Sequence, residues 1–189
     1  MDGAVLIKSI LKEQPIIFAV KTEEAFQKAI KSHLPVVFLL YGNLCNIADL
    51  VEQCKKAHKI VYVHIDLIEG LAQREAAIDF LAEQTLTDGV ISTRAKLLHY
   101  AKEKGFSTIL RVFQLDSMSI ESIGKNVEIA NPDFIECLPG IVTRYFKQLK
   151  DEHKTDIIAG GLLSSKEDVD NALKAGAIAV SMSGVGGYE

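Results

Sequence analysis

Charged and titratable side chains stand at intervals along the chain, each near the end of an apolar run. They are His64, Asp66, Glu69, Arg94, Arg111, Asp116 and Glu136. A guanidinium donates hydrogen bonds to phosphate oxygens, and carboxylates accept hydrogen bonds from the hydroxyl groups of a small ligand. The set therefore predicts a ligand site. It can equally form a buried network, in which Arg111 is paired with Glu136 or Asp66 and no ligand is needed.

A second set of residues could hold a phosphate group. The segment DIIAGGLLSSKEDVDNALKAGAIAVSMS, residues 156–183, contains two apolar runs that end in small or hydroxylated residues. Gly160 and Gly161 lack a Cβ, so their backbone N–H groups can approach a ligand closely. The second run ends in hydroxyl and N–H donors, namely Ser181, Ser183 and Gly184. We predict that the two ends form a phosphate cradle, although the glycine pair could also be only a tight turn.

The elements that must position these residues alternate between strands and helices. Apolar runs typical of buried parallel strands start near Ile16, Val36, Ile60, Asp88, Thr108, Asp133, Asp156 and Ala177. The stretches between them have apolar residues at i, i+3, i+4 and i+7, which indicates helices packed by one face. One of these helices should begin at Ser165, because Ser165 and Asp168 have the S-x-x-D form of a capping box.

Such an alternation is compatible with a closed barrel or an open doubly wound sheet. No Gly-x-Gly-x-x-Gly pattern follows the first strand, where a dinucleotide-binding sheet would carry it. We therefore predict an α/β fold, a single small (β/α)8 TIM barrel with at most one helical turn after the last strand. Residues 4–13 should cover its N-terminal mouth. The carboxyl ends of the strands meet at the opposite mouth, which would gather the polar residues.

Composition limits the function. The 189 residues include 21 Lys and Arg against 25 Asp and Glu, a formal net charge of −4. An RNA-binding surface would therefore have to concentrate its cations on one face, for example after dimerisation. The three cysteines show no C-x-x-C spacing, so we expect free thiols in a reducing cytoplasm and no metal site. The apolar runs are too short to cross a membrane, and the length favours one domain over residues 1–189.

Five segments, taken in order, resemble a known family. They are HIDLIEGL (64–71), DGVISTR (88–94), RVFQLDS (111–117), PDFIECLPG (132–140) and IIAGGLLSSKEDVDNALKAGAIAVSMS (157–183). From about Ile16 onward, with similar spacing, the chain closely resembles the glycerol uptake operon antiterminator family. The match is far more specific than any single barrel motif.

The resemblance implies a compact TIM barrel that senses glycerol 3-phosphate. It implies a cytoplasmic regulator, not an enzyme, that binds the leader mRNA of glycerol uptake and metabolism genes and lets transcription pass a terminator. We expect no cofactor, and a homo-oligomer remains open. Carried over by position, Gly160, Gly161, Ser181 and Ser183 form the phosphate end of the site. The charged residues named first occupy the family's polar strand-end positions.

Two other functions stay open. A barrel enzyme, an isomerase or lyase acting on a small phosphate ester, would use Glu136 or Asp66 as its base. A relative that binds the ligand but acts through protein contacts would need no RNA. Against an enzyme, the sequence shows no evident nucleophile with its base and no cluster of metal ligands.

Overall fold

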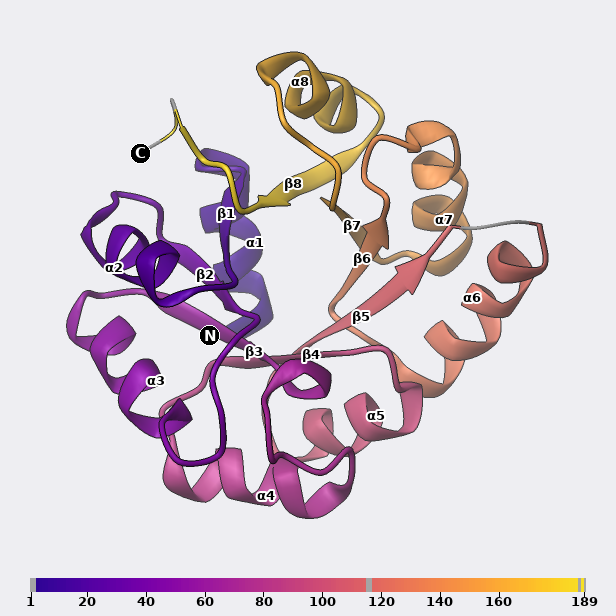
Figure 1. The fold of residues 1–189 in the computed structure, drawn as a ribbon. Coiled ribbons are helices and arrows are strands. Elements are labelled where there is room, and N and C mark those ends of the chain that lie inside the picture. The colour runs from indigo at the N-terminus through magenta and orange to yellow at the C-terminus, as the bar shows by residue number, and fades with distance from the viewer. Residues whose placement is uncertain (1–2, 115–116, 187, 189) are drawn as a thin grey trace.

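The computed structural model describes residues 3–114, 117–186 and 188, which contain a closed barrel of eight parallel strands. Figure 1 looks along the barrel, with the helices that connect the strands lying outside them. The strands are β1 Ile16–Val20, β2 Val36–Leu39, β3 Ile60–His64, β4 Gly89–Ser92, β5 Ser107–Phe113, β6 Phe134–Leu138, β7 Asp156–Gly160 and β8 Ala177–Met182. Each begins at the expected residue or at its neighbour. Pairing of β1 with β8, Ile17 opposite Ser181, closes the predicted TIM barrel.

Helices connect successive strands and cover the outside of the barrel. They are α2 Glu23–Lys31, α3 Ile47–Lys56, α4 Glu75–Gln84, α5 Ala95–Glu103, α6 Ser117–Ala130, α7 Phe146–His153 and α8 Lys166–Lys174, with the 3-10 turns η1 Ile65–Leu67 and η2 Thr143–Tyr145. Helix α3 illustrates the packing, because Ile47, Leu50, Val51 and Cys54 form one buried stripe against the barrel. In the described part of the chain, up to residue 186, no helix follows β8.

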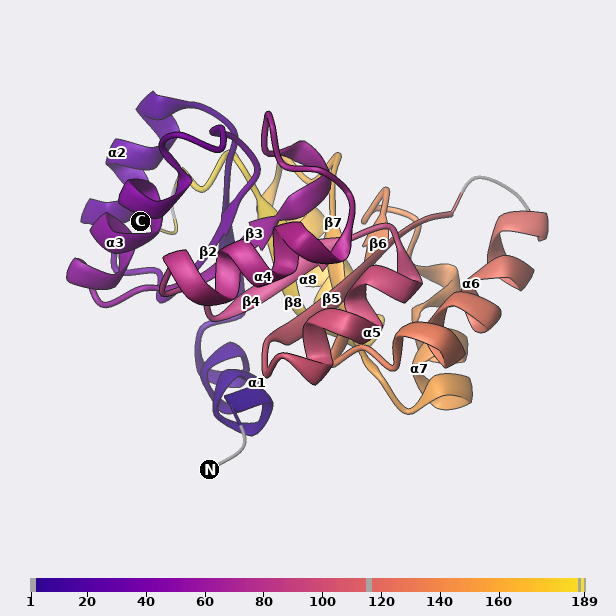
Figure 2. The same ribbon diagram turned by 90° about the horizontal axis from the view of Figure 1, so that it is seen from below.

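A further helix, α1 Gly3–Glu13, covers the N-terminal mouth of the barrel. Figure 2 shows it below the strands. Its Ile7 and Leu11 are buried with inward-facing barrel residues such as Phe38 and Phe134. Fully burying apolar side chains of this size contributes roughly 1.5–3 kcal/mol each. The expected cover is therefore present, and apolar packing closes this end of the barrel.

Inward-facing side chains change character along the barrel axis. Ile109 on β5 and Phe134 on β6 belong to the buried apolar cluster inside the barrel. Side chains alternate across a strand, so Arg111 and Glu136, two positions further on, also face inward. The interior is thus apolar toward α1 and polar at the C-terminal mouth, where the strands end.

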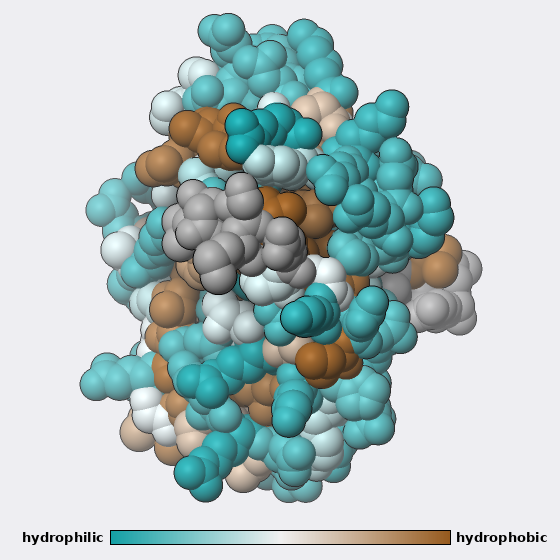
Figure 3. All heavy atoms as spheres, turned by 90° about the vertical axis from the view of Figure 1, so that its right-hand side faces the viewer, coloured by the Kyte–Doolittle hydropathy of each residue, from teal (hydrophilic) through white to brown (hydrophobic). Residues whose placement is uncertain are grey.

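The outer surface is mainly polar. Figure 3 shows the side to the right in Figure 1, where hydrophilic residues cover most of the face and apolar atoms occupy scattered areas. No helix in the described part of the chain is long and apolar enough to span a bilayer.

Candidate functional site

An ion pair between neighbouring strands lies at the C-terminal mouth. Arg111 on β5 is opposite Glu136 on β6 in the strand register, and Arg111 Nε lies 2.6 Å from Glu136 Oε2. The two side chains are 10% and 1% exposed. A charge this deeply buried is strongly destabilising unless it is paired. Of the two partners that the sequence allowed for Arg111, the structure gives Glu136.

The other oxygen of the Glu136 carboxylate is bound by the opposite side of the site. Ser181 on β8 donates from Oγ to Glu136 Oε1 over 2.6 Å. A Cβ on Gly160 would lie 2.6 Å from that same Oε1 and 2.8 Å from Ser181 Oγ. The missing side chain of Gly160 is therefore what lets Glu136 and Ser181 meet.

Just beyond β7 the backbone turns at Gly161 and Leu162, with φ angles of +73° and +59°. The N–H of Gly140 donates to the carbonyl oxygens of Gly160, at 2.6 Å, and Gly161, at 3.0 Å. These bonds tie the turn to the loop after β6. The tight turn that the sequence allowed is present, and phosphate binding by the same glycines stays a prediction.

The predicted start of α8 at Ser165 is confirmed. Ser165 Oγ accepts the N–H of Asp168 at 3.1 Å, and the Asp168 carboxylate accepts the N–H groups of Ser164 and Ser165 at 2.9 Å each. These bonds, led by that from Ser164, lower the pKa of Asp168. Three backbone N–H donors at this helix start are therefore occupied, so a bound anion would rely on other groups of the mouth.

A small cavity of about 90 Å³ opens among these residues. It is lined by Ala19, Lys21, Leu40, Arg111, Glu136, Leu138, Gly161, Leu162, Leu163, Ser181, Met182 and Ser183. Pockets for drug-sized ligands measure roughly 300–1,000 Å³, so this cavity suits only a small molecule. Lys21 adds a cation that the sequence analysis missed. Its position directly after the first strand was the available signal, because ligand contacts in barrels follow strand ends.

His64, at the end of β3, is a buried polar group. Its side chain is 2% exposed, and neither ring nitrogen has a hydrogen-bond partner among the described residues. Burial, aided by the charge of Arg111 and opposed by Asp66, lowers the pKa of His64 to about 4. The imidazole is therefore neutral near pH 7, with one donor and one acceptor nitrogen.

Asp66 holds the loop that follows β4. Its carboxylate accepts hydrogen bonds from Ser92 Oγ at 2.9 Å, Thr93 N at 2.7 Å and Thr93 Oγ1 at 3.0 Å. Ser92 Oγ in turn accepts the N–H of Arg94 at 3.0 Å. Asp66 therefore positions the start of α5, and its charge also acts on the pKa of His64.

His64 and Asp66 do not line the cavity, and the remaining predicted site residues also lie away from it or outside the described residues. Glu69 is exposed, and its backbone N–H joins the loop after β2 through a 3.0 Å bond to Gly42 O. Gly184 is exposed beside Ser183 and does not line the cavity. Asp116 is outside the described residues. Arg94 is exposed immediately before α5.

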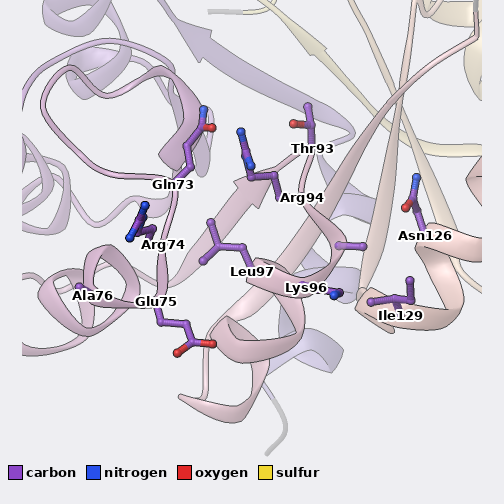
Figure 4. Close-up of a pocket in the computed structure, with 11 residues that line it drawn as sticks. Gln73, Arg74, Glu75, Ala76, Thr93, Arg94, Lys96, Leu97, Asn126 and Ile129 are labelled. Carbon is purple, nitrogen blue, oxygen red and sulfur yellow. The ribbon is translucent and has the colours of Figure 1, made fainter.

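Arg94 contributes to a second concave region, which we call the groove. It lies between the starts of α4 and α5 and the side of α6, with a volume of about 760 Å³. Its lining residues are Gln73, Arg74, Glu75, Ala76, Thr93, Arg94, Ala95, Lys96, Leu97, Asn126 and Ile129. Figure 4 shows Arg94 beside Gln73, with Asn126 across from them on α6. The structure thus separates Arg94 from Arg111, which the sequence had placed at one site.

Comparison with known proteins identifies close relatives. A family model described as "Glycerol-3-phosphate responsive antiterminator" matches residues 16–185. "Uncharacterized protein YgcP" of Escherichia coli K12 is 40% identical over 177 residues, which cover 94% of this chain and 93% of that protein. The crystal structure of the glycerol uptake operon antiterminator regulatory protein from Listeria monocytogenes matches with a TM-score of 0.87 and 32% identity, covering 90% of this chain and 92% of that one.

Two further structures extend the comparison. A glycerol uptake operon antiterminator-related protein from Thermotoga maritima matches with a TM-score of 0.78 and 31% identity, covering 89% of this chain and 94% of that one. The deoxyribose phosphate aldolase of Aeropyrum pernix has a TM-score of 0.68 at 14% identity, over 94% of this chain and 88% of its own, which shows a shared fold alone. With the family model matching most of its length, the chain belongs to the glycerol-3-phosphate responsive antiterminator family.

Proposed function

We propose that the chain is a glycerol-3-phosphate-sensing, RNA-binding antiterminator that regulates glycerol uptake and metabolism genes. It acts in the cytoplasm on a leader mRNA and catalyses no reaction. Membership of the family and the likeness to the Listeria monocytogenes regulatory protein support this function. The observation that carries it is the small polar cavity at the barrel mouth, which has the chemistry for a short polyol phosphate.

The cations of the mouth match the phosphate group. Lys21 borders the cavity, and Arg111 has five N–H donors, of which its bond to Glu136 uses one. A phosphate near Gly161 and Ser183 would form ion pairs with these two cations and accept hydrogen bonds from hydroxyl and backbone N–H groups. We assign the phosphate end to Gly160, Gly161, Ser181, Ser183 and Gly184. Gly160 contributes through its backbone, since a side chain there would displace Glu136.

The hydroxyl groups of glycerol 3-phosphate fit the acidic part of the mouth. Each carboxylate oxygen of Glu136 is already bonded once, to Arg111 or Ser181. A carboxylate has about four acceptor positions, so it can accept ligand hydroxyls in addition. His64, neutral and without a partner among the described residues, does not line the cavity, but it is close enough to Arg111 for that charge to lower its pKa.

Asp66 offers a route from ligand binding to the outside of the barrel. Its charge opposes the lowering of the His64 pKa, and it is bonded to Ser92 and Thr93 in the loop before α5. A ligand that changes the surroundings of His64 would alter the position or strength of this tie. The proposed regulator thus senses in the barrel interior and responds at the start of α5.

Thermal denaturation with candidate effectors tests the sensing function. Glycerol 3-phosphate at about 100 times its dissociation constant should add about 2.7 kcal/mol to the free energy of unfolding. Glycerol and inorganic phosphate, which each carry half of the recognised chemistry, should add much less at equal concentration. Equal effects of all three compounds, or none, would refute recognition of a polyol phosphate.

The same samples test for catalysis. Incubation with glycerol 3-phosphate or a triose phosphate should leave each compound unchanged, as a regulator requires. Conversion of either compound by the wild-type chain, lost on substitution of Glu136, would instead support a barrel isomerase or lyase that uses this carboxylate as its base.

A further inference from the structure

The groove carries positive charge on a chain whose formal net charge is −4. Three cations line it, Arg74, Arg94 and Lys96, against one lining carboxylate, Glu75. All three cationic residues are exposed. Figure 4 shows the Arg94 side chain on the same side as Gln73, while the Glu75 carboxylate points the opposite way. The groove therefore concentrates positive charge on one face of an acidic protein.

These three groove cations differ from their neighbours in having no ion pair with a residue of the described ranges. The nearby Lys104, at the end of α5, lies 2.7 Å from Asp79 of α4. The Asp66 carboxylate next to the groove is already occupied by Ser92 and Thr93. The guanidinium groups of Arg74 and Arg94 therefore remain available to an external anion. Each has a planar fork that fits phosphate oxygens in a bidentate manner.

The other lining residues fit a sugar–phosphate chain better than a single anion. Gln73, Thr93 and Asn126 provide neutral donors and acceptors, and Leu97 and Ile129 provide an apolar floor. A volume of about 760 Å³ exceeds the needs of one phosphate group. None of the lining residues is aromatic, so the groove is not a platform for stacking bases. Contacts with phosphates and ribose hydroxyls remain as the main source of affinity.

The wall of the groove is also connected to the barrel mouth. Thr93 and Arg94 precede α5, and Asp66 holds this loop through Thr93 directly and through Ser92 to the N–H of Arg94. A change in the position of Asp66 would therefore move the loop that carries Thr93 and Arg94. An effector bound at the mouth can therefore influence a partner in the groove through this loop.

From these observations we propose that the groove binds the phosphate backbone of RNA through Arg74, Arg94 and Lys96. The proposal rests on the proposed function, which supplies an RNA partner, and adds the surface that the partner occupies. It also offers a way for an acidic chain to bind a polyanion, since the groove gathers three cations that have no ion pair with any residue that the structure describes.

The test compares two triple variants with equal charge change. The groove variant is Arg74→Gln, Arg94→Gln and Lys96→Gln. The control variant is Lys12→Gln, Lys147→Gln and Lys174→Gln, which removes three exposed cations from α1, α7 and α8. The probe is the leader transcript of the glycerol uptake genes, and its affinity is measured against salt concentration. Thermal denaturation confirms that both variants are folded.

The wild type and the control variant should bind the leader transcript alike. The groove variant should lose on the order of a hundredfold in affinity near 0.1 M salt, and its salt slope should shrink by about 2, as expected for three lost contacts to single-stranded RNA. Full binding by the groove variant, or equal loss in both variants, would refute the groove as the RNA-binding surface. Either result would leave the proposed function standing. A wild-type protein that does not bind the transcript would overturn the proposed function. Binding of polyglutamate at the groove in place of RNA would mark a surface for acidic proteins and also refute the proposal.

Discussion

The barrel mouth and the groove both present arginine side chains, but they hold them in opposite ways. At the mouth, Arg111 is 10% exposed and is bonded to a carboxylate that is 1% exposed. In the groove, Arg94 is exposed and has no ion pair within the described ranges. A ligand at the mouth would share groups that already have partners, whereas an anion in the groove would meet cations that have no ion pair in the described part of the chain.

This difference separates two requirements of a ligand-controlled regulator. A buried, mutually bonded pair has a fixed geometry, which suits the recognition of one small molecule. Exposed cations contribute only about 0–1 kcal/mol to folding, and their attraction to a polyanion depends on salt. Single substitutions should therefore affect folding strongly at the mouth and weakly in the groove.

The largest expected effect is the loss of stability in Glu136→Ala. This change leaves the Arg111 guanidinium buried without its partner, which typically costs about 3–5 kcal/mol. Urea denaturation should show a loss of this size. Glu75→Ala in the groove is the matched control and should change stability by about 0.5 kcal/mol or less. Similar small effects in both variants would mean that Arg111 and Glu136 are not coupled in the folded protein.

A slightly smaller effect concerns the pH dependence of stability. Burial lowers the pKa of His64 to about 4 in the folded state, against about 6.5 in an unfolded chain. Between these values the unfolded state binds more protons, so stability falls as the pH falls from about 6.5 to 4. The loss attributable to His64 is roughly 3 kcal/mol. Denaturation of wild type and His64→Gln across this range should show it, and parallel curves would contradict a buried neutral imidazole.

Arg111→Lys separates ligand recognition from charge. Lysine keeps the positive charge beside Glu136 but loses the planar fork, so folding should largely survive. Loss of a charge-assisted hydrogen bond, about 1.5–3 kcal/mol, should weaken glycerol 3-phosphate binding roughly tenfold to a hundredfold in calorimetry. Arg94→Lys should leave this affinity unchanged. The reverse pattern would place the effector in the groove.

The smallest expected effect compares two glycines with positive φ. Gly161 in the mouth has φ +73°, and Gly176 before β8 has φ +106° with open space around it. Replacing either by Ala should cost about 1–2 kcal/mol of stability, because the left-handed region disfavours a Cβ. Only Gly161→Ala should also weaken glycerol 3-phosphate binding. If calorimetry finds equal affinity in both variants, the glycine at 161 serves the turn alone.

The fold could be predicted from the sequence because its signals are local and repeated. Each apolar run, such as the one starting at Ile16, indicates a strand buried on both faces. Each stretch with helical apolar spacing indicates a helix that packs on the outside of the sheet. The closure of the sheet followed from the number of repeats and was confirmed by the pairing of Ile17 with Ser181. The start of helix α8 could also be predicted from a local signal, because its capping box depends on Ser165 and Asp168 alone.

The site was less predictable because it depends on distances across the barrel. The sequence left Glu136 and Asp66 equal as partners of Arg111, and only the strand register decides between them. Side-chain direction placed Arg94 outside the barrel, although it follows a strand end as the mouth residues do. The packing role of Gly160 against Glu136 likewise requires the spatial neighbour to be known.

The affinity for the leader transcript, measured with and without glycerol 3-phosphate at fixed salt, tests the proposed function most directly. If the mouth senses the effector and the groove binds RNA, glycerol 3-phosphate should change RNA affinity by about 5- to 150-fold, as coupled sites typically do. The transcript must then change the affinity for glycerol 3-phosphate by the same factor. Identical RNA affinity in saturating glycerol 3-phosphate and in its absence would contradict a ligand-controlled antiterminator.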